Sequence, residues 1–218
     1  MESSMEERQH RFQNNYIIQA WLCILLALLF GASLAGVQAA LGPVISENKV
    51  NETKEKVPEL LLGDDAVQSA EPLDISVHTV KVTKKDATKI YTVYEAKFAD
   101  GTPAGWVTKV AGQGYADRIE LLLGLAPQAE RITGLFILDQ KETPGLGNRI
   151  IEQKWRQQFS KKGTETTLKV VKGGGKSPEE IDAVTGATIS SNSVVSIINK
   201  AIADLKQPLS KGIKTKKD

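Results

Sequence analysis

The sequence lacks the side chains that hold metals or build a disulfide framework. Its 218 residues include one cysteine, Cys23, and two histidines, His10 and His78. One thiol cannot form an intramolecular disulfide or supply the ligands of a zinc or iron–sulfur site, and two histidines are too few for a histidine-rich centre. We therefore expect no metal site, and if the protein moves electrons it should use an organic cofactor.

A large excess of charge of one sign is also missing. The chain has 28 basic and 26 acidic residues, which gives a formal net charge of +2. Because this balance creates no broad cationic field, we expect no nucleic-acid partner. A serine–histidine–carboxylate set is not indicated either, since His10 precedes a long apolar run and His78 lies in a strand-like segment. We expect no catalytic residue and no independent catalysis.

The N-terminal part does contain a long stretch without charged residues. No charged residue occurs between residues 12 and 46, and residues 16–41 are mostly apolar. A helix of about 20 such residues crosses the hydrocarbon core of a bilayer. We predict a single transmembrane helix at 16–41 behind a short cytoplasmic segment at 1–15. Tyr16 and Trp21 suit the membrane interface.

A cleaved signal peptide is the alternative for this stretch. Arg8 and Arg11 precede it, and Val-Gln-Ala at 37–39 resembles a small-residue cleavage site. The length of the apolar run favours the anchor. Charge does not decide the orientation, because these two arginines compete with three lysines at 49–56 on the other side.

The rest of the chain has the pattern of one α+β domain. The segment 42–72, most of it polar, contains Pro58 and Pro72 and indicates a linker or short helical stalk. Asp100-Gly101 is typical of a hairpin turn. Runs rich in β-branched and aromatic residues predict strands at 75–82, 90–98, 106–110, 119–125 and 132–138.

Apolar spacing predicts two helices after these strands, at 149–159 and 191–205, with a short strand at 168–171 between them. We therefore expect a largely antiparallel sheet with flanking helices over 73–206, followed by a basic, disordered tail at 207–218. The predicted apolar stripes are Ile150, Ile151, Trp155 and Phe159 in the first helix, and Val194, Ile198, Ala201, Ile202 and Leu205 in the second.

The motif Asp-Ala-Val-Thr-Gly-Ala-Thr at 182–188 stands directly before the last predicted helix. Its glycine permits close approach of a ligand, and unpaired amides at a helix start favour anions. A phosphate on Thr188 would lie in that field. The plainer interpretation is an ordinary helix start, with Ser190 or Ser191 as the N-cap.

A second motif, Glu-Thr-Pro-Gly-Leu-Gly at 142–147, follows a predicted strand. Its glycines and proline indicate a tight loop that could present backbone amides, Glu142 and Thr143 to a planar ring, with Leu146 against one face. An ordinary strand-to-helix connection would have a similar composition.

The run Gly-Gly-Gly-Lys-Ser at 173–177 ends like a phosphate-binding P-loop. That pattern needs a further glycine at position 170, where this chain has Val170. The glycines are better interpreted as a flexible turn. Ser177 to Glu180 can then start a helical turn as a capping box.

The first two motifs, forty residues apart and preceded by a membrane anchor, resemble the covalent FMN-binding family. Within it the chain is most similar to the G subunits of Rnf-type ion-translocating oxidoreductases, and next to the C subunits of the sodium-pumping NADH:quinone oxidoreductase. The Gly-Gln-Gly-Tyr turn at 112–115 also resembles the family. The similarity covers the anchor and roughly residues 75–205.

The resemblance implies that a flavin transferase moves the FMN moiety of FAD onto Thr188 and forms a phosphoester. Gln140 and Lys141 stand where the family often has a histidine, which puts a proton-donor role there in doubt. The other cofactor-binding residues that the resemblance implies are Asp182, Thr185, Gly186 and Ala187 in the attachment motif and Glu142, Thr143 and Leu146 around the flavin ring.

The resemblance also implies a function. The chain would be an electron-transfer subunit in a single-pass arrangement in the inner membrane, with its FMN domain on the periplasmic or extracellular side. The complex would couple electron flow from ferredoxin to NAD to translocation of Na⁺ or H⁺. Its partners would be the FMN-bearing D subunit, the membrane-embedded A and E subunits, the iron–sulfur B subunit and the NADH-binding C subunit. The alternatives are a C subunit of the quinone reductase and a non-redox, membrane-anchored binding module.

Overall fold

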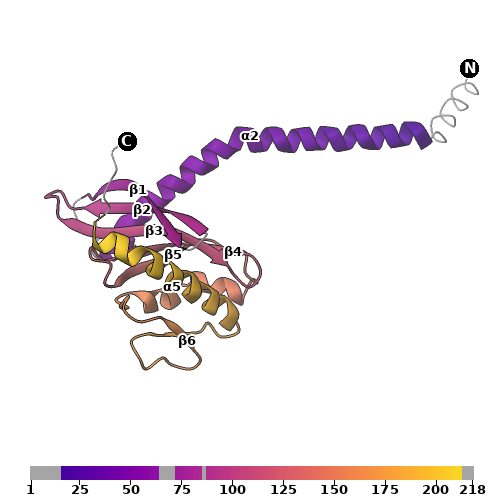
Figure 1. Cartoon of the computed structure of the whole chain (residues 1–218). Helices are drawn as coiled ribbons and strands as arrows, with labels where there is room; N and C mark the ends of the chain where they lie inside the picture. The colour runs from indigo at the N-terminus through magenta and orange to yellow at the C-terminus, as the bar shows by residue number, and fades with distance from the viewer. Residues whose placement is uncertain (1–15, 64–71, 85–86, 213–218) are drawn as a thin grey trace, which may run out of the picture. The chain divides into compact units, whose positions relative to one another are not determined.

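The computed structural model describes residues 16–63, 72–84 and 87–212. Contacts divide the chain after Asn51 into two compact units. The parts predicted at 1–15 and at 213–218 lie outside the described residues. Figure 1 shows the elements of both units along the chain.

Helix α2 (Tyr16–Leu62) is 47 residues long. Its most apolar stretch of 18 residues has a mean hydropathy of 2.3, and none of that stretch is buried. Among the described residues it is the one helix that is long and apolar enough to cross a membrane. The helix continues 21 residues past the predicted end at 41. Much of the predicted stalk is therefore helical, because Glu, Lys and Leu between 47 and 62 favour helix.

Five antiparallel strands form the main sheet in sequential order, which confirms the five predicted strands (Figure 1). The predicted hairpin turn is present, with Gly101 at φ +82°. The Asp100 carboxylate accepts the amide of Thr102 at 2.8 Å. The strands are β1 (Asp74–Lys84), β2 (Ala87–Lys97), β3 (Pro103–Gln113), β4 (Arg118–Leu125) and β5 (Ile132–Asp139).

Both faces of the sheet are covered. One face packs with the last helix, α5 (Thr188–Ser210), in the larger core. Val57 and Leu60, from the last turns of α2, pack with sheet residues in a second core on the other face. Gly124 permits this contact, because a Cβ at that position would lie 2.9 Å from the carbonyl oxygen of Leu60. The sheet is thus fixed between two helical layers.

The helix predicted at 149–159 is wrong as a single element. The segment contains η1 (Gly147–Ile151), α4 (Gln153–Arg156) and η2 (Gln157–Phe159), with Glu152 at an extended ψ of 129° between the first two. Since a 3₁₀ turn has three residues, side chains four apart do not stay on one face. Trp155 and Phe159 are buried as predicted, but Ile151 is 47% exposed.

Helix α5 is longer than predicted at both ends. It begins at Thr188 rather than Ser191, and its N-cap is Ala187, so the serine cap of the plainer interpretation is not formed. The Ser191 hydroxyl instead donates to the carbonyl of Ala187 and accepts the amide of Val184, each at 3.0 Å. The helix also runs past Leu205 to Ser210 with Leu209 buried, so the predicted tail is helical at its start.

Two short parallel strands, β6 (Lys169–Val171) and β7 (Glu180–Asp182), form a second sheet. The strand predicted at 168–171 is confirmed. The turn predicted from Ser177 is present, with the amide of Glu180 donating to the carbonyl of Ser177 at 3.0 Å, but no helix follows it. The Glu180 carboxylate does accept the amides of Lys176 and Ser177, at 2.7 and 3.2 Å. These bonds close a turn that leads into β7. The chain continues as a strand rather than a helix because it pairs with β6 from Glu180 onward.

Candidate functional site

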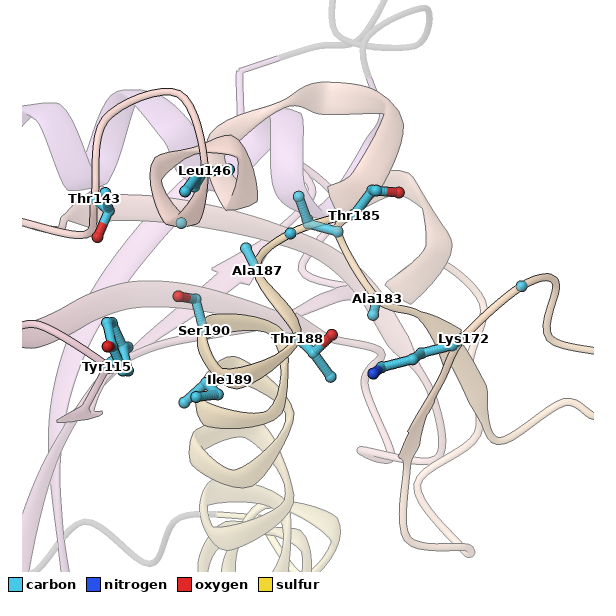
Figure 2. Close-up of a pocket in the computed structure, with 14 residues that line it drawn as sticks. Tyr115, Thr143, Leu146, Lys172, Ala183, Thr185, Ala187, Thr188, Ile189 and Ser190 are labelled. Carbon is cyan, nitrogen blue, oxygen red and sulfur yellow. The ribbon is translucent and has the colours of Figure 1, made fainter.

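A pocket of about 740 Å³ lies at the N-terminal end of α5 (Figure 2). Four separate segments contribute to it: the β3–β4 turn, the loop before η1, the loop after β6, and the stretch from β7 into α5. The lining residues are Tyr115, Thr143, Leu146, Gly147, Lys172, Gly173, Ala183, Val184, Thr185, Gly186, Ala187, Thr188, Ile189 and Ser190. Both sequence motifs therefore meet at one cavity.

Thr188 is the first residue of α5 and is half-buried in the pocket wall. No side chain caps this helix end, and the first turn has no acidic residue. The amides of the first turn and the helix dipole therefore give this part of the pocket a partial positive charge. An anion bound beside Thr188 would be stabilised by that charge.

Gly186 shapes the turn that leads to Thr188. Its φ of +83° is a left-handed conformation that favours glycine, and a Cβ there would lie 3.0 Å from Cδ2 of Leu146. The two sequence motifs thus touch at this glycine. Thr185, Gly186, Ala187 and Thr188, which belong to the predicted attachment motif, all line the pocket.

Glu142 lies within the wall of the pocket and is 3% exposed. Its Oε1 accepts the amide of Ala116 at 3.0 Å, and its Oε2 accepts a short hydrogen bond from the hydroxyl of Ser190. This one carboxylate therefore joins the β3–β4 turn, the loop at 142–147 and α5. Glu142 is not among the lining residues, whereas Thr143 and Leu146 from the same motif are.

Three large apolar side chains at the pocket are exposed to solvent. Leu146 is 47%, Ile189 58% and Tyr115 62% exposed. Exposed apolar side chains gathered around a cavity are typical of a site that holds a ligand with an apolar surface. Ile189 was not predicted, and its signal was its place directly after Thr188. Tyr115 was noted only as part of the turn at 112–115.

Asp182, a predicted site residue, does not line the pocket. Its Oδ1 accepts the amides of Gly174 and Gly175, at 2.7 and 2.8 Å. The carboxylate thus holds the glycine loop that follows β6. In the same loop, the amide of Lys176, followed by that of Ser177, holds the pKa of the Glu180 carboxyl below its ordinary value.

Lys172 is a pocket residue that sequence analysis missed. Among the described lining residues it is the only one with a charged side chain, and Figure 2 shows its ammonium group pointing toward Thr188. The sequence signal was weak, because a lysine after a three-residue strand is common on protein surfaces. The described part of the chain holds no group of three or more His, Cys, Asp or Glu that could bind a metal.

Comparison with known proteins gives a consistent result. The model of the FMN-binding domain matches residues 114–203, which include both pocket motifs. The G subunit of the Na⁺-translocating ferredoxin:NAD⁺ oxidoreductase complex of Acetobacterium woodii is 37% identical over 116 residues, 52% of this chain and 55% of that protein. The match thus spans about half the length of that relative.

A second relative matches over more of its length. The G subunit of the proton-translocating ferredoxin:NAD⁺ oxidoreductase complex of Clostridium ljungdahlii is 32% identical over 142 residues, 62% of this chain and 75% of that protein. The crystal structure of Shewanella oneidensis NqrC superposes with a TM-score of 0.63, covering 76% of this chain and all of that chain at 17% identity, and confirms the fold. This chain therefore belongs to the family of proteins built on the FMN-binding domain, together with the G subunits of ion-translocating ferredoxin:NAD⁺ oxidoreductase complexes.

Proposed function

We propose that this chain is the electron-transferring G subunit of an Rnf-type complex and carries FMN as a phosphoester on Thr188. The observation that carries this proposal is the position of Thr188 in the wall of the pocket, at an uncapped helix start. The family match over residues 114–203 supports the choice of cofactor.

The pocket has the features that FMN requires. Its volume of about 740 Å³ falls within the range of pockets that hold cofactors. The first turn of α5 would stabilise the phosphate, and Leu146, Ile189 and Tyr115 offer exposed apolar surface to the ring. FMN would supply one-electron and two-electron transfer.

Attachment requires FAD and a separate flavin transferase. Oγ1 of Thr188 forms a bond to the phosphorus of the FMN half of FAD, the P–O bond of the pyrophosphate breaks, and AMP leaves with that electron pair. The hydroxyl proton passes to solvent or to a base of the transferase. The half-buried position of Thr188, beside the exposed Thr185 and Gly186, leaves the hydroxyl within reach of such an enzyme.

The protein residues fix the position of the cofactor rather than take part in electron transfer. Glu142 holds the loop at 142–147 against Ser190 and so keeps Leu146 and Thr143 beside the first turn of α5. Gln140 also fixes this loop, since its Oε1 accepts the amide of Glu142 at 2.7 Å. A covalent phosphoester would keep the flavin in a pocket whose apolar rim is open to solvent.

The membrane part of the proposal rests on α2. Its apolar section would anchor the chain as a single span in the inner membrane, with the FMN domain on the periplasmic or extracellular side. The electron partners would be the FMN-bearing D subunit, the membrane-embedded A and E subunits, the iron–sulfur B subunit and the NADH-binding C subunit. Since no charged residue occurs between 12 and 46, this span alone offers no path for the transported Na⁺ or H⁺.

A role as the C subunit of a Na⁺-translocating NADH:quinone reductase is the second candidate. The observation in its favour is sequence similarity to the C subunit of the Na⁺-translocating NADH-quinone reductase of Pasteurella multocida, which is 37% identical over 101 residues, 42% of this chain and 39% of that protein. The two candidates share the attachment chemistry and differ in their electron partners. Co-purification separates them, because an Rnf-type complex brings the iron–sulfur B subunit with this chain. A non-redox binding module has no specific observation in its favour.

The test is to express the full chain with a flavin transferase and to examine it under ultraviolet light after denaturing gel electrophoresis. We expect a fluorescent wild-type band and a dark Thr188→Val band. Thr188→Ser keeps a hydroxyl and should give a fluorescent band that is weaker than the wild type. Thr166→Val, an exposed threonine outside the pocket, should stay fluorescent. A fluorescent Thr188→Val band would reject the attachment site, and a dark wild-type band would reject covalent FMN.

A further inference from the structure

We propose that Lys172 pairs with the phosphate of the flavin held at Thr188, and that Asp182 positions Lys172 through the glycine loop. This inference rests on the proposed function, because it needs a phosphate beside Thr188. It assigns the two residues separate tasks: Lys172 contacts the ligand, and Asp182 acts only through the loop that carries Lys172.

Lys172 has the position and the charge for such a contact. It lines the pocket, and its ammonium group points toward Thr188 (Figure 2). The structure records no ion pair or hydrogen bond for its side chain among the described residues, whereas Lys176 on the same loop and the other described lysines do not line the pocket. The ammonium group is therefore available to an incoming anion.

The phosphoester itself needs a cation. A phosphate bonded to two carbon chains keeps one ionised oxygen, so a full negative charge would lie beside Thr188. The first turn of α5 offers about half a positive charge from its dipole. Lys172 is the described pocket residue that can complete the balance.

The glycine loop resembles a phosphate-binding loop, but its amides are already occupied. Gly173 and Gly174 have φ of +85° and +92°, which turns the amides of Gly174 and Gly175 toward Asp182. These amides donate to the Asp182 carboxylate and cannot bind an external phosphate at the same time. A ligand contact from this loop thus falls to Lys172, at its start.

Asp182 has the geometry of a positioning residue. It lies opposite Val171 in the parallel pair of β6 and β7, and Val171 directly precedes Lys172. The amide of Ala183, the next residue, donates to the carbonyl of Val171 at 2.8 Å. The loop is therefore held on both sides of Lys172: by strand pairing before it and by the Asp182 carboxylate after it.

The test uses the full chain, loaded by the flavin transferase and studied in detergent by phosphorus NMR. Lys172→Met should move the phosphodiester resonance toward its position in the denatured protein, whereas Lys172→Arg should stay near the wild type. Lys176→Met is the matched control, because it removes the same charge from the same loop outside the pocket. We also expect Lys172→Met to load roughly two- to fivefold more slowly at low salt, the size of an exposed charge pair.

Asp182 variants separate contact from positioning. Asp182→Ala should move the resonance as Lys172→Met does, since the loop loses both hydrogen bonds. Asp182→Asn keeps an acceptor oxygen and should recover most of the wild-type position. The double variant Asp182→Ala with Lys172→Met should show no further movement beyond Lys172→Met alone.

The outcomes are distinct. A wild-type chain without a phosphodiester resonance would overturn the proposed function itself. If the resonance of Lys172→Met stays at the wild-type position, only the role of Lys172 is overturned. If the resonance of Asp182→Ala stays there, the role of Asp182 is overturned. Should Lys172→Met fail to load, loading of Lys172→Arg would support the need for a cation, and failure of both would reject it.

Discussion

In the last part of α5 the helix buries Asp204, which is 7% exposed, and surrounds its carboxylate with donors from two strands. Lys84 and Lys89 donate to it at 2.5 and 3.1 Å, and the hydroxyl of Tyr91 donates at 2.6 Å. At Thr188, the other end of the same helix, no side-chain cap and no acidic residue is present.

This difference separates a structural polar group from a binding one. The carboxylate of Asp204 is satisfied within the protein, so it fixes β1 and β2 against α5 and has nothing left to offer a ligand. The first turn of α5 keeps donors that the protein does not use, and a pocket has formed there. Variants at the two ends should therefore separate folding from flavin attachment.

The largest effect on stability is expected at Asp204. Asp204→Ala leaves the Tyr91 hydroxyl without its acceptor and removes both lysine contacts, while Lys84 and Lys89 can return to water because they are more than half exposed. We expect the free energy of unfolding to fall by about 2 to 3 kcal/mol. Thermal unfolding, monitored by circular dichroism, measures this loss of stability.

Flavin attachment should survive this change at temperatures where the domain stays folded, since Asp204 lies outside the pocket. Asp139→Ala, an exposed carboxylate at the end of β5, is the control and should alter stability by less than about 0.5 kcal/mol. If Asp204→Ala lost covalent flavin while still folded, the contrast between the two helix ends would be wrong.

Glu142 is expected to give a smaller loss of stability but a direct loss of attachment. Glu142→Ala leaves the buried Ser190 hydroxyl and the amide of Ala116 without an acceptor, which costs about 1 to 2 kcal/mol. The loop at 142–147 would then no longer be held against α5. We expect weaker in-gel flavin fluorescence than in the wild type, with Glu142→Gln recovering part of it.

The different fates of these residues show what the sequence can predict. The five strands follow from local β-propensity and alternation, and the two motifs at 142–147 and 182–188 contain turn chemistry that is visible residue by residue. Their meeting at one pocket was an inference from resemblance, because no local signal states that residues forty positions apart are neighbours.

The missed features depend on tertiary contacts. Glu142 was named from the sequence, but its place within the wall was not, because that place depends on hydrogen bonds from the amide of Ala116 and the hydroxyl of Ser190. Strand β7 is three residues long and is formed through its pairing with β6, so its sequence alone was too short to predict a strand. Lys172 could not be recognised as a pocket residue from the sequence, because the other segments that form the pocket are distant from it along the chain.

Gly186 tests the contact between the two motifs, and its expected effect on stability is about 1 kcal/mol. Gly186→Ala places a side chain at φ +83° and brings its Cβ within 3.0 Å of Leu146. Gly101→Ala, in the hairpin between β2 and β3, is a matched control, because it has φ +82° but no atom within 4 Å of the new Cβ. Both variants should be destabilised alike, and only Gly186→Ala should slow flavin attachment; equal rates would show that the Leu146 contact does not shape the pocket.

The smallest expected effect is the dependence of stability on pH at the Asp204 end. Burial alone would raise the pKa of Asp204, but hydrogen bonds from Lys84, Tyr91 and Lys89 outweigh it and hold this pKa at about 2, below its ordinary value of 3.8. Because the pKa is lower in the folded state, the contribution is complete above the ordinary pKa and is lost as the pH falls from near 4 toward 2. Unfolding of wild type and Asp204→Asn compared from pH 7 to pH 3 should give a stability difference that is constant down to about pH 5 and then narrows; a difference that widens in acid would contradict the assigned ion pairs.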